Sequence, residues 1–234
     1  MSLASLATPT RRYDAERLED PALDRRLVLR SLRDIRRSNA LFGGRAAATA
    51  EARLLFDELP ARATVLDVGT GLGDVPAHIA RAAGRRGIDV RTIGLDAEPV
   101  LAAAARPRVT HAVCASGLAL PFATRSVDLV TCSQVLHHFR GEAARALLCE
   151  LNRVACVGVV ISDLRRCWIA AAGFWLASFP LGFHPVTRHD GVVSVLRGFT
   201  DDELAGTIED AVRVRPVIRH RLGFRVTTHW RTAR

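Results

Sequence analysis

The chain has 234 residues, a formal net charge of +9 and a hydrophobic fraction of 49%, which is enough apolar sequence for one sizeable core. All 33 of its basic residues are arginine. The absence of lysine excludes a P-loop, a pyridoxal Schiff base and a Schiff-base aldolase, because each of these needs a lysine.

The positive charge does not by itself indicate a nucleic-acid partner. The arginines are scattered along the whole chain, with 24 acidic residues between them. A surface built to bind nucleic acid would gather its positive charge on one stretch or face. The composition therefore favours an ordinary solvated surface, and nucleic-acid binding stays open only as an alternative.

The cysteines and the first residues bear on metal binding and location. The five cysteines have no CxxC spacing, so we expect buried free thiols in a reducing compartment and no metal site. The opening MSLASLATPTRRYD has no long apolar run before a cleavage site. We therefore expect a cytoplasmic protein.

Helical periodicity comes first along the chain. In residues 21–41, Val28, Leu32 and Ile35 recur on one face while arginines occupy the others, which predicts an amphipathic helix. Gly43-Gly44 ends this pattern, and a second helix is expected over roughly 45–59. Residues 1–59 would then form an N-terminal helical cap.

An alternation of strands and helices follows and predicts the fold class. The strand-like runs are 64–68, 90–95, 109–113, 127–132 and 156–162, and the helical patterns between them are 74–84, 98–106 and 141–154. Such alternation is typical of right-handed βαβ units around a parallel sheet. We therefore predict an α/β three-layer sandwich whose cofactor-binding core spans 60–162.

The pattern changes after residue 162. Residues 163–199 read as an apolar, aromatic insertion, interpreted as a substrate lid, with a core helix as the alternative. Its uncharged stretch is short and is interrupted by Pro180, so no membrane span is expected. Thr200 and Glu203 predict a capping box, and the tail predicts an antiparallel hairpin turning near Leu222, so that 200–234 completes a single domain of 1–234.

The stretch TVLDVGTGLGD marks the expected ligand site. Gly69, Gly71 and Gly73 follow the first strand at once, so the backbone can turn tightly and a ligand can lie against it. Asp96 ends the second strand, where a carboxylate can accept hydrogen bonds from both ribose hydroxyls. Together these features predict a nucleoside cofactor.

The glycine spacing narrows the choice of cofactor. A dinucleotide fingerprint would place glycine at the sixth position from Gly69, but Asp74 stands there and would repel a pyrophosphate. S-adenosylmethionine has no phosphate and carries a cationic sulfonium and amino group. Asp67 and Asp74 would attract those charges.

Three runs, VLDVGTGLGD, GLDAEP and LALPFATRSVDLVTCSQVLHHF, resemble the class I S-adenosylmethionine-dependent methyltransferases, particularly their small-molecule "type 11" branch. The resemblance covers about residues 60–165. It implies a Rossmann-like α/β/α sandwich with a seven-stranded, mostly parallel sheet in the order 3-2-1-4-5-7-6, the last strand antiparallel. It also implies S-adenosylmethionine as cofactor and S-adenosylhomocysteine as product.

The same resemblance assigns the cofactor contacts. Asp67, Gly69 and Gly71 would surround the methionine part, Asp96 would hold the ribose, and Ala97 would lie beside the adenine. Ser116 stands where the family usually has an aspartate for the adenine amino group, so we expect a weaker bond there. The expected cofactor-binding residues are Asp67, Gly69, Thr70, Gly71, Asp74, Asp96, Ala97, Ser116, Gly117, Leu118 and Ser133.

Catalytic candidates lie at the carboxyl ends of the fourth and fifth strands, where this type of sheet binds its ligands. His137 and His138 follow the fourth strand and Asp163 ends the fifth. An imidazole can deprotonate an acceptor near neutral pH, and Asp163 could orient it. Alternatively, one histidine packs against the cofactor while the other bonds to the backbone.

The acceptor is expected to be small and hydrophobic. The patterns SDLRR and RHDGVVSVLRGFT, with SNALFGG, resemble methyltransferases of bacterial polyketide and other secondary metabolism, which implies O-methylation of a phenolic or hydroxylated polyketide-like acceptor. The candidate acceptor contacts are Trp168, Trp175, His189 and Arg197. Carbon methylation, RNA or other nucleic-acid methylation, a non-methylating cofactor-binding homologue and a homodimer stay open.

Overall fold

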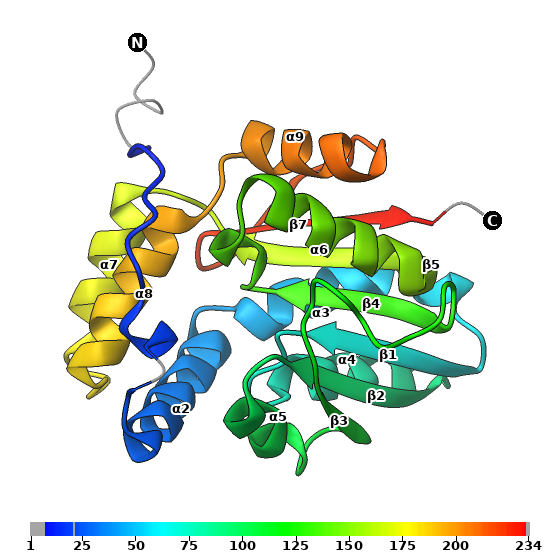
Figure 1. Cartoon of the computed structure of the whole chain (residues 1–234), viewed down its shortest axis with the longest axis horizontal. Coiled ribbons are helices and arrows are strands. Elements are labelled where there is room, and N and C mark those ends of the chain that lie inside the picture. The colour runs from blue at the N-terminus through cyan, green and yellow to red at the C-terminus, as the bar shows by residue number, and fades with distance from the viewer. Residues whose placement is uncertain (1–7, 21, 233–234) are drawn as a thin grey trace.

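A computed structural model describes residues 8–20 and 22–232 (Figure 1). Their centre is a seven-stranded sheet in the order β3-β2-β1-β4-β5-β7-β6, which confirms the predicted order. The strands are β1 (Arg62–Val68), β2 (Asp89–Asp96), β3 (His111–Cys114), β4 (Val127–Ser133), β5 (Ala155–Leu164), β6 (Arg219–Arg221) and β7 (Arg225–Arg231).

The helices fall close to the predicted ranges. They are η1 (Arg17–Glu19), α2 (Arg25–Leu41), α3 (Gly44–Ala52), η2 (Arg53–Glu58), α4 (Asp74–Gly84), α5 (Pro99–Ala105), η3 (Leu136–His138), α6 (Gly141–Val154), α7 (Trp168–Ser178), α8 (Pro185–Arg197) and α9 (Asp201–Val212). The second predicted helix is shorter than expected, because its α-helical part ends at Ala52 and continues as the 3-10 helix η2.

The strand pairing brings the end of the chain to the middle of the molecule. Strands β1 to β5 pair in parallel, whereas β7 is antiparallel to both β5 and β6. In this register Asp163 lies opposite Val226, and Leu164 lies opposite Arg225. The C-terminal hairpin therefore places its first residues beside the carboxyl end of β5.

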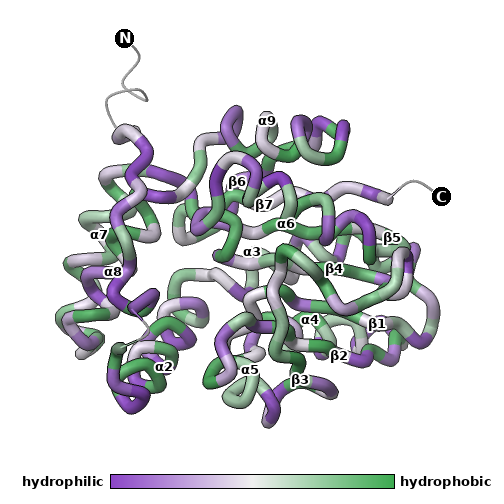
Figure 2. The backbone as a smooth tube through the Cα atoms, viewed as in Figure 1, coloured by the Kyte–Doolittle hydropathy of each residue, from purple (hydrophilic) through white to green (hydrophobic). Residues whose placement is uncertain are grey.

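Helices cover both faces of the sheet, as the alternation predicted. Val65, Leu129 and Val160 pack with α3, η2 and α4 on one face. Their neighbours in the chain, such as Leu66 and Ile161, pack with α6 and α9 on the other, because successive side chains of a strand point in opposite directions. Figure 2 shows the apolar character of the central strands β4 and β5.

The end of the insertion is fixed by the predicted capping box. The N–H of Glu203 donates to Thr200 Oγ1 at 3.3 Å, and the N–H of Thr200 donates to Glu203 Oε2 at 3.0 Å. Glu203 also accepts two hydrogen bonds of 2.7 Å from the buried guanidinium of Arg166. These contacts join the start of the insertion to the start of α9.

Residues 8–20, named here the N-terminal strap, run along α8 (Figure 1). Both carboxylate oxygens of the buried Asp190 accept hydrogen bonds from the strap, from the N–H of Arg17 at 2.9 Å and of Leu18 at 3.0 Å. Ser194 Oγ donates to Glu16 Oε1 at 2.6 Å. The strap is thus held to α8 by polar contacts, which the sequence patterns did not predict.

Two expectations from composition are tested by the fold. In residues 8–20 and 22–232, no helix has the length and hydropathy needed to cross a lipid bilayer. The five cysteines are free, but only Cys132 and Cys167 are buried as expected; Cys149 and Cys156 are partly buried, and Cys114 is exposed because it ends the edge strand β3.

Candidate functional site

A cavity of about 760 Å³ opens beyond the carboxyl ends of β1, β2 and β4. Its volume lies in the upper half of the usual range for ligand pockets. The glycine turn and Asp96 form one part of its wall, and the loop from Ser133 to Phe139 forms another. The strap, α2, Phe174 of α7 and residues of α8 complete the wall on the opposite side.

The glycine turn provides the close backbone approach that its sequence predicted. Gly69, Gly71 and Gly73 all have positive φ angles, of 72°, 53° and 72°. A Cβ atom on Gly69 would collide with the side chain of Val135, whereas the space beside Gly71 is open. A ligand can therefore lie directly against the backbone at Gly71.

Acidic groups around this turn make the site attractive to a cation. Burial raises the pKa of Asp67 to about 7, more than the hydrogen bonds from Thr131 and Thr70 lower it, and the charges of Asp74 and Asp96 raise it further. Burial also raises the pKa values of Asp74 and Asp96. A cationic ligand would relieve this destabilisation.

Asp96 keeps a well-ordered carboxylate at the end of β2. Its Oδ2 accepts from the N–H of Gly71 at 3.0 Å, and its Oδ1 accepts from the N–H of Glu98 at 3.2 Å. Each carboxylate oxygen can accept a further hydrogen bond. The side chain is therefore held in place while it keeps acceptor capacity for a ribose.

Most of the expected cofactor residues meet in one place. The cavity is lined by Asp67, Gly69, Thr70, Gly71, Asp74, Asp96, Ala97, Gly117 and Ser133. Ser116 and Leu118 do not line it: Ser116 Oγ accepts from the N–H of Leu118 at 3.2 Å, and Leu118 is exposed. The structure therefore does not place these two residues where they were expected to contact the adenine, and the Ser116 hydroxyl is used within its own turn.

His137 and Asp163 form a buried pair at the ends of β4 and β5. His137 Nδ1 lies 2.7 Å from Asp163 Oδ1, and the N–H of His137 donates to Asp163 Oδ2 at 3.2 Å. The N–H of Leu164 also donates to Asp163 Oδ1, at 2.7 Å. Asp163 thus fixes both the backbone and the ring of His137.

The other ring nitrogen of His137 has no such partner. His137 Nε2 is buried and has no hydrogen-bond partner among the described residues, and the residue lines the cavity. Its nearest acidic neighbour is Glu16 Oε1 of the strap at 3.8 Å, which is too long for a hydrogen bond. A buried, unpartnered nitrogen at a cavity wall is available to a ligand.

The charges around His137 favour its protonated form. Burial lowers its pKa, but the attraction and hydrogen bond of Asp163, with the weaker effect of Glu16, outweigh burial and raise the pKa to about 9. Burial raises the pKa of Asp163, but the same pairing outweighs this and lowers it overall. The imidazole is therefore a stronger base than a free histidine.

His138 connects the site to the strap. Its Nδ1 lies 2.8 Å from Glu19 Oε1, and Arg197 Nη1 lies 3.0 Å from Nδ1 and 2.6 Å from Glu19 Oε1. Glu16, His137 and His138 also offer three potential metal ligands within 4.8 Å of one another. Arg197 Nη1 lies 3.6 Å from Glu16 Oε1, so a guanidinium already supplies positive charge there.

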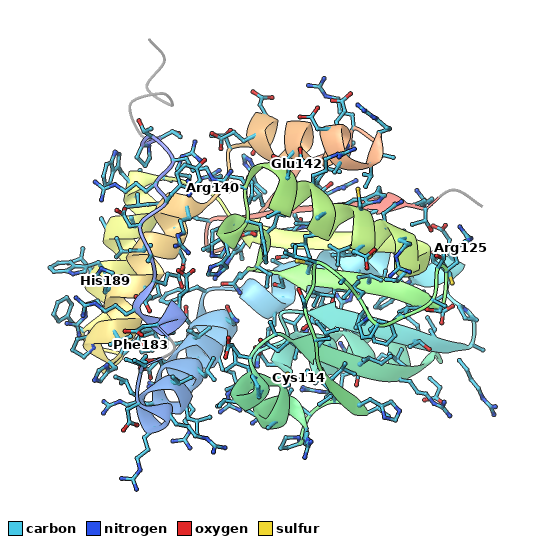
Figure 3. The ribbon with its side chains drawn as sticks, in the orientation of Figure 1. Cys114, Arg125, Arg140, Glu142, Phe183 and His189 are labelled. Carbon is cyan, nitrogen blue, oxygen red and sulfur yellow. The ribbon has the colours of Figure 1, made fainter. Side chains whose placement is uncertain are left out.

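The expected acceptor contacts are placed differently. Trp168, Trp175, His189 and Arg197 do not line the cavity. Trp168 and Trp175 are both 47% exposed on the outer face of α7, His189 lies at the outer side of α8 (Figure 3), and Arg197 is bound by Glu19.

Phe174 takes the position expected for the two tryptophans. It packs against Phe42 and Phe183, with ring centroids 6.1 Å away in each case, and its side chain lines the cavity. Neighbouring residues of a helix point in different directions, so Trp175 faces outward when Phe174 faces inward. A Cβ atom on Gly191 would collide with the Phe174 ring, so glycine there makes room for it.

Several residues of the cavity wall were not singled out in the sequence. They are Glu16 and Glu19 of the strap, Asn39 of α2, Gln134 after β4 and Arg225 of β7. Gln134 adopts a left-handed backbone with φ of 57°, which a non-glycine residue seldom does. Strained residues often mark functional sites. In the sequence, the available signal was the position of Gln134 between Ser133 and the two histidines.

Several solved structures with the same fold are methyltransferases. An S-adenosylmethionine-dependent methyltransferase from Aquifex aeolicus matches 86% of this chain and 98% of its own, with a TM-score of 0.58 and 15% identity. The CurJ carbon methyltransferase matches 91% of this chain and 62% of its own, with a TM-score of 0.58 and 13% identity. Magnesium protoporphyrin IX methyltransferase from Synechocystis PCC 6803 with bound S-adenosylmethionine matches 92% of this chain and 100% of its own, with a TM-score of 0.56 and 15% identity.

The chain therefore has the fold of these S-adenosylmethionine-dependent methyltransferases. Residues 66–161 match the family model described as "Methyltransferase domain", so this region is a methyltransferase domain, for which S-adenosylmethionine is the cofactor. No curated protein matches the sequence significantly.

Proposed function

We propose that this methyltransferase transfers a methyl group to a hydroxyl oxygen of a small, hydrophobic, phenolic or hydroxylated polyketide-like acceptor, with His137 as the general base. The observation that carries the proposal is His137 Nε2, which is buried at the cavity wall without a hydrogen-bond partner among the described residues. Asp163, 2.7 Å from the other ring nitrogen, would orient the ring and stabilise its protonated form.

The residues of the glycine turn fit S-adenosylmethionine. Asp96 would hold the ribose, and Asp67 and Asp74 would attract the charged amino and sulfonium groups. Arg36 of α2 is half-buried, lines the cavity and interacts with Asp74, so it would bind the methionine carboxylate. When bound, the cofactor supplies an electrophilic methyl carbon, so the protein has to orient the acceptor and remove its proton.

The basicity of His137 suits a phenol. Proton transfer to a general base becomes more favourable as the pKa of the base approaches that of the group it deprotonates. The pKa of His137 is about 9, and a phenol such as tyrosine has a pKa near 10. An aliphatic hydroxyl is far less acidic, so this match supports a phenolic acceptor.

The shape of the site supports a small acceptor. Leu18 and Leu23 from the N-terminal region, Phe174 of α7 and Val195 of α8 contribute apolar surface to the cavity. The strap lies across the side of the cavity that faces α8. A long polymer such as RNA would have to displace the strap to bring a base to His137.

The test is methyl transfer from labelled S-adenosylmethionine to a panel of phenols, hydroxylated polyketides and short RNA. We expect label on phenolic oxygen, identified by NMR of the product. His137→Gln should lose at least about 100-fold in kcat and still bind S-adenosylhomocysteine. His111→Gln, on the exposed end of β3, is the matched control. Label on ring carbon or on RNA, or full activity of His137→Gln, would contradict the proposal.

A further inference from the structure

Arg225, the first residue of β7, lies at the cavity wall next to the end of β5. It is only 4% exposed, and it lines the cavity. It pairs with Leu164 across the strands, which is the residue after Asp163. A full positive charge is therefore buried at the wall where the proposed acceptor would lie.

The guanidinium of Arg225 has no carboxylate partner. Its Nη1 donates to the neutral side-chain oxygen of Gln134 at 2.7 Å, and its buried Nε has no hydrogen-bond partner among the described residues. Over the same residues it forms no ion pair within 4.0 Å. Two other arginines are buried in the described part of the chain, and they differ: Arg166 is held by Glu203 and Arg197 by Glu19, each closer than 3 Å.

Burying an unpaired charge is costly, so the arrangement calls for a counter-charge. Burial lowers the pKa of Arg225 to about 10, and the more distant Asp163 offsets this only in part. Asp163 already accepts from the N–H groups of His137 and Leu164 and pairs with the His137 ring. It cannot serve fully as the partner of a second cation.

The side chains around Arg225 hold it in position. Gln134 Nε2 donates to Asn39 Oδ1 at 2.6 Å, which turns the amide oxygen of Gln134 towards Arg225. A Cβ atom on Gly44 would lie 2.6 Å from Asn39 Oδ1, so glycine is needed for this chain of hydrogen bonds. A neutral amide thus orients the guanidinium and leaves its charge available.

We propose that Arg225 binds a carboxylate of the acceptor, so that the enzyme methylates a hydroxylated acid in preference to a neutral phenol. The proposal rests on the proposed function, which places the acceptor against His137. A planar guanidinium can donate two parallel hydrogen bonds to a carboxylate. The carboxylate serves as the group that is recognised, and the hydroxyl receives the methyl group.

The cofactor's own carboxylate is a less suitable partner. Arg225 is on β7, three strands from β1, and the glycine turn follows β1. At about 4.8 Å per strand, the two strands lie roughly 14 Å apart. Arg36 interacts with Asp74 of the glycine turn and lines the cavity, so it offers a cation for the methionine carboxylate on that side.

The test compares acids with neutral amides of the same shape. Calorimetry would measure binding of the hydroxybenzoates and 4-hydroxycinnamate, and of their amides, to the protein saturated with S-adenosylhomocysteine. We expect an acid that fits the site to bind about 10- to 100-fold more tightly than its amide. Arg225→Met should remove that preference without weakening S-adenosylhomocysteine binding. Arg215→Met, at an exposed ion pair with Glu209, should keep it.

A second variant covers the case in which Arg225→Met does not fold. Gln134→Glu places a carboxylate against the retained Arg225 and should also remove the preference for the acid. Equal binding of acid and amide by the wild type, no binding of either, or a preference that survives in the variants would overturn the proposal. So would an equal loss of S-adenosylhomocysteine affinity, because Arg225 would then serve the cofactor.

Binding and transfer separate this inference from the proposed function. His137→Gln should keep the acid preference while it loses methyl transfer. A wild type that binds acids through Arg225 but methylates none of them would refute the proposed function and leave the Arg225 site standing. A product methylated on the carboxylate would refute the assignment of that group to recognition alone.

Discussion

Asp163→Asn should change the pH dependence of catalysis, because Asp163 holds His137 in its protonated form. With a pKa of about 9 for His137, only about 1 in 100 of these imidazoles is neutral at pH 7. The kcat/KM of the wild type should therefore rise about tenfold per pH unit towards pH 9. Without the charge of Asp163, the burial that lowers this pKa remains, and the midpoint should fall by about two pH units or more.

The same substitution should also lower the maximal rate and the stability. General bases contribute about 10²- to 10⁴-fold to rate. The plateau rate of the variant should fall by a factor of that order, because the ring is no longer oriented by a carboxylate. Removing one member of a buried charged pair costs about 3–5 kcal/mol. For a chain of this size this corresponds to a fall in Tm of about 6–20 °C.

The assay is the initial rate of methyl transfer from labelled S-adenosylmethionine between pH 6 and pH 10, below the Tm of each variant. S-adenosylhomocysteine binding, measured at every pH, separates loss of the cofactor site from loss of the base. Asp128→Asn is the control, since Asp128 accepts a hydrogen bond from Thr64 away from the cavity. A variant with the wild-type midpoint and plateau would refute the role of the pair.

Three further predictions concern the cofactor and the strap. Asp96→Ala removes the charged acceptor at Gly71 and the proposed ribose, so S-adenosylhomocysteine affinity by calorimetry should fall about 100-fold or more; an unchanged affinity would refute this role. The pKa of Asp67 is raised to about 7, and a cationic ligand favours its ionised form, so the affinity of the wild type for S-adenosylmethionine should increase from pH 6 to pH 8. An affinity that does not change with pH would count against a role of Asp67 in binding the cofactor. Glu16→Gln removes one of the charges that raise the pKa of His137, so the rate profile should shift to lower pH by less than in Asp163→Asn; a shift to higher pH would contradict the assignment.

The sequence was most informative where local pattern and fold agree. The parallel sheet was predictable because strand and helix patterns alternate along the chain. The glycine turn and Asp96 were predictable because each lies at the end of a predicted strand. The pairing of Asp163 with one of the two histidines was also predicted, because adjacent parallel strands bring their carboxyl ends together, and the structure pairs it with His137. Which histidine faces the cavity without a partner depended on the 3-10 turn η3.

The remaining parts of the site depend on contacts between distant segments. Periodicity does not fix the rotation of α7 about its axis, so the sequence did not show that Phe174 would face the cavity and Trp175 the outside. Glu16 meets His137 because the strap is held to α8, by contacts that include those of Asp190 and Ser194. Arg225 enters through an antiparallel strand inserted beside β5, and only the three-dimensional arrangement shows that it has no carboxylate partner.

The insertion of β7 next to β5 also orders events during synthesis. All the strands and loops that would bind the cofactor lie before residue 165, whereas Arg225 and the rest of β7 leave the ribosome after all of them. The residues that would bind the cofactor are therefore made before Arg225, and the acceptor part of the cavity is complete only when β7 closes against β5.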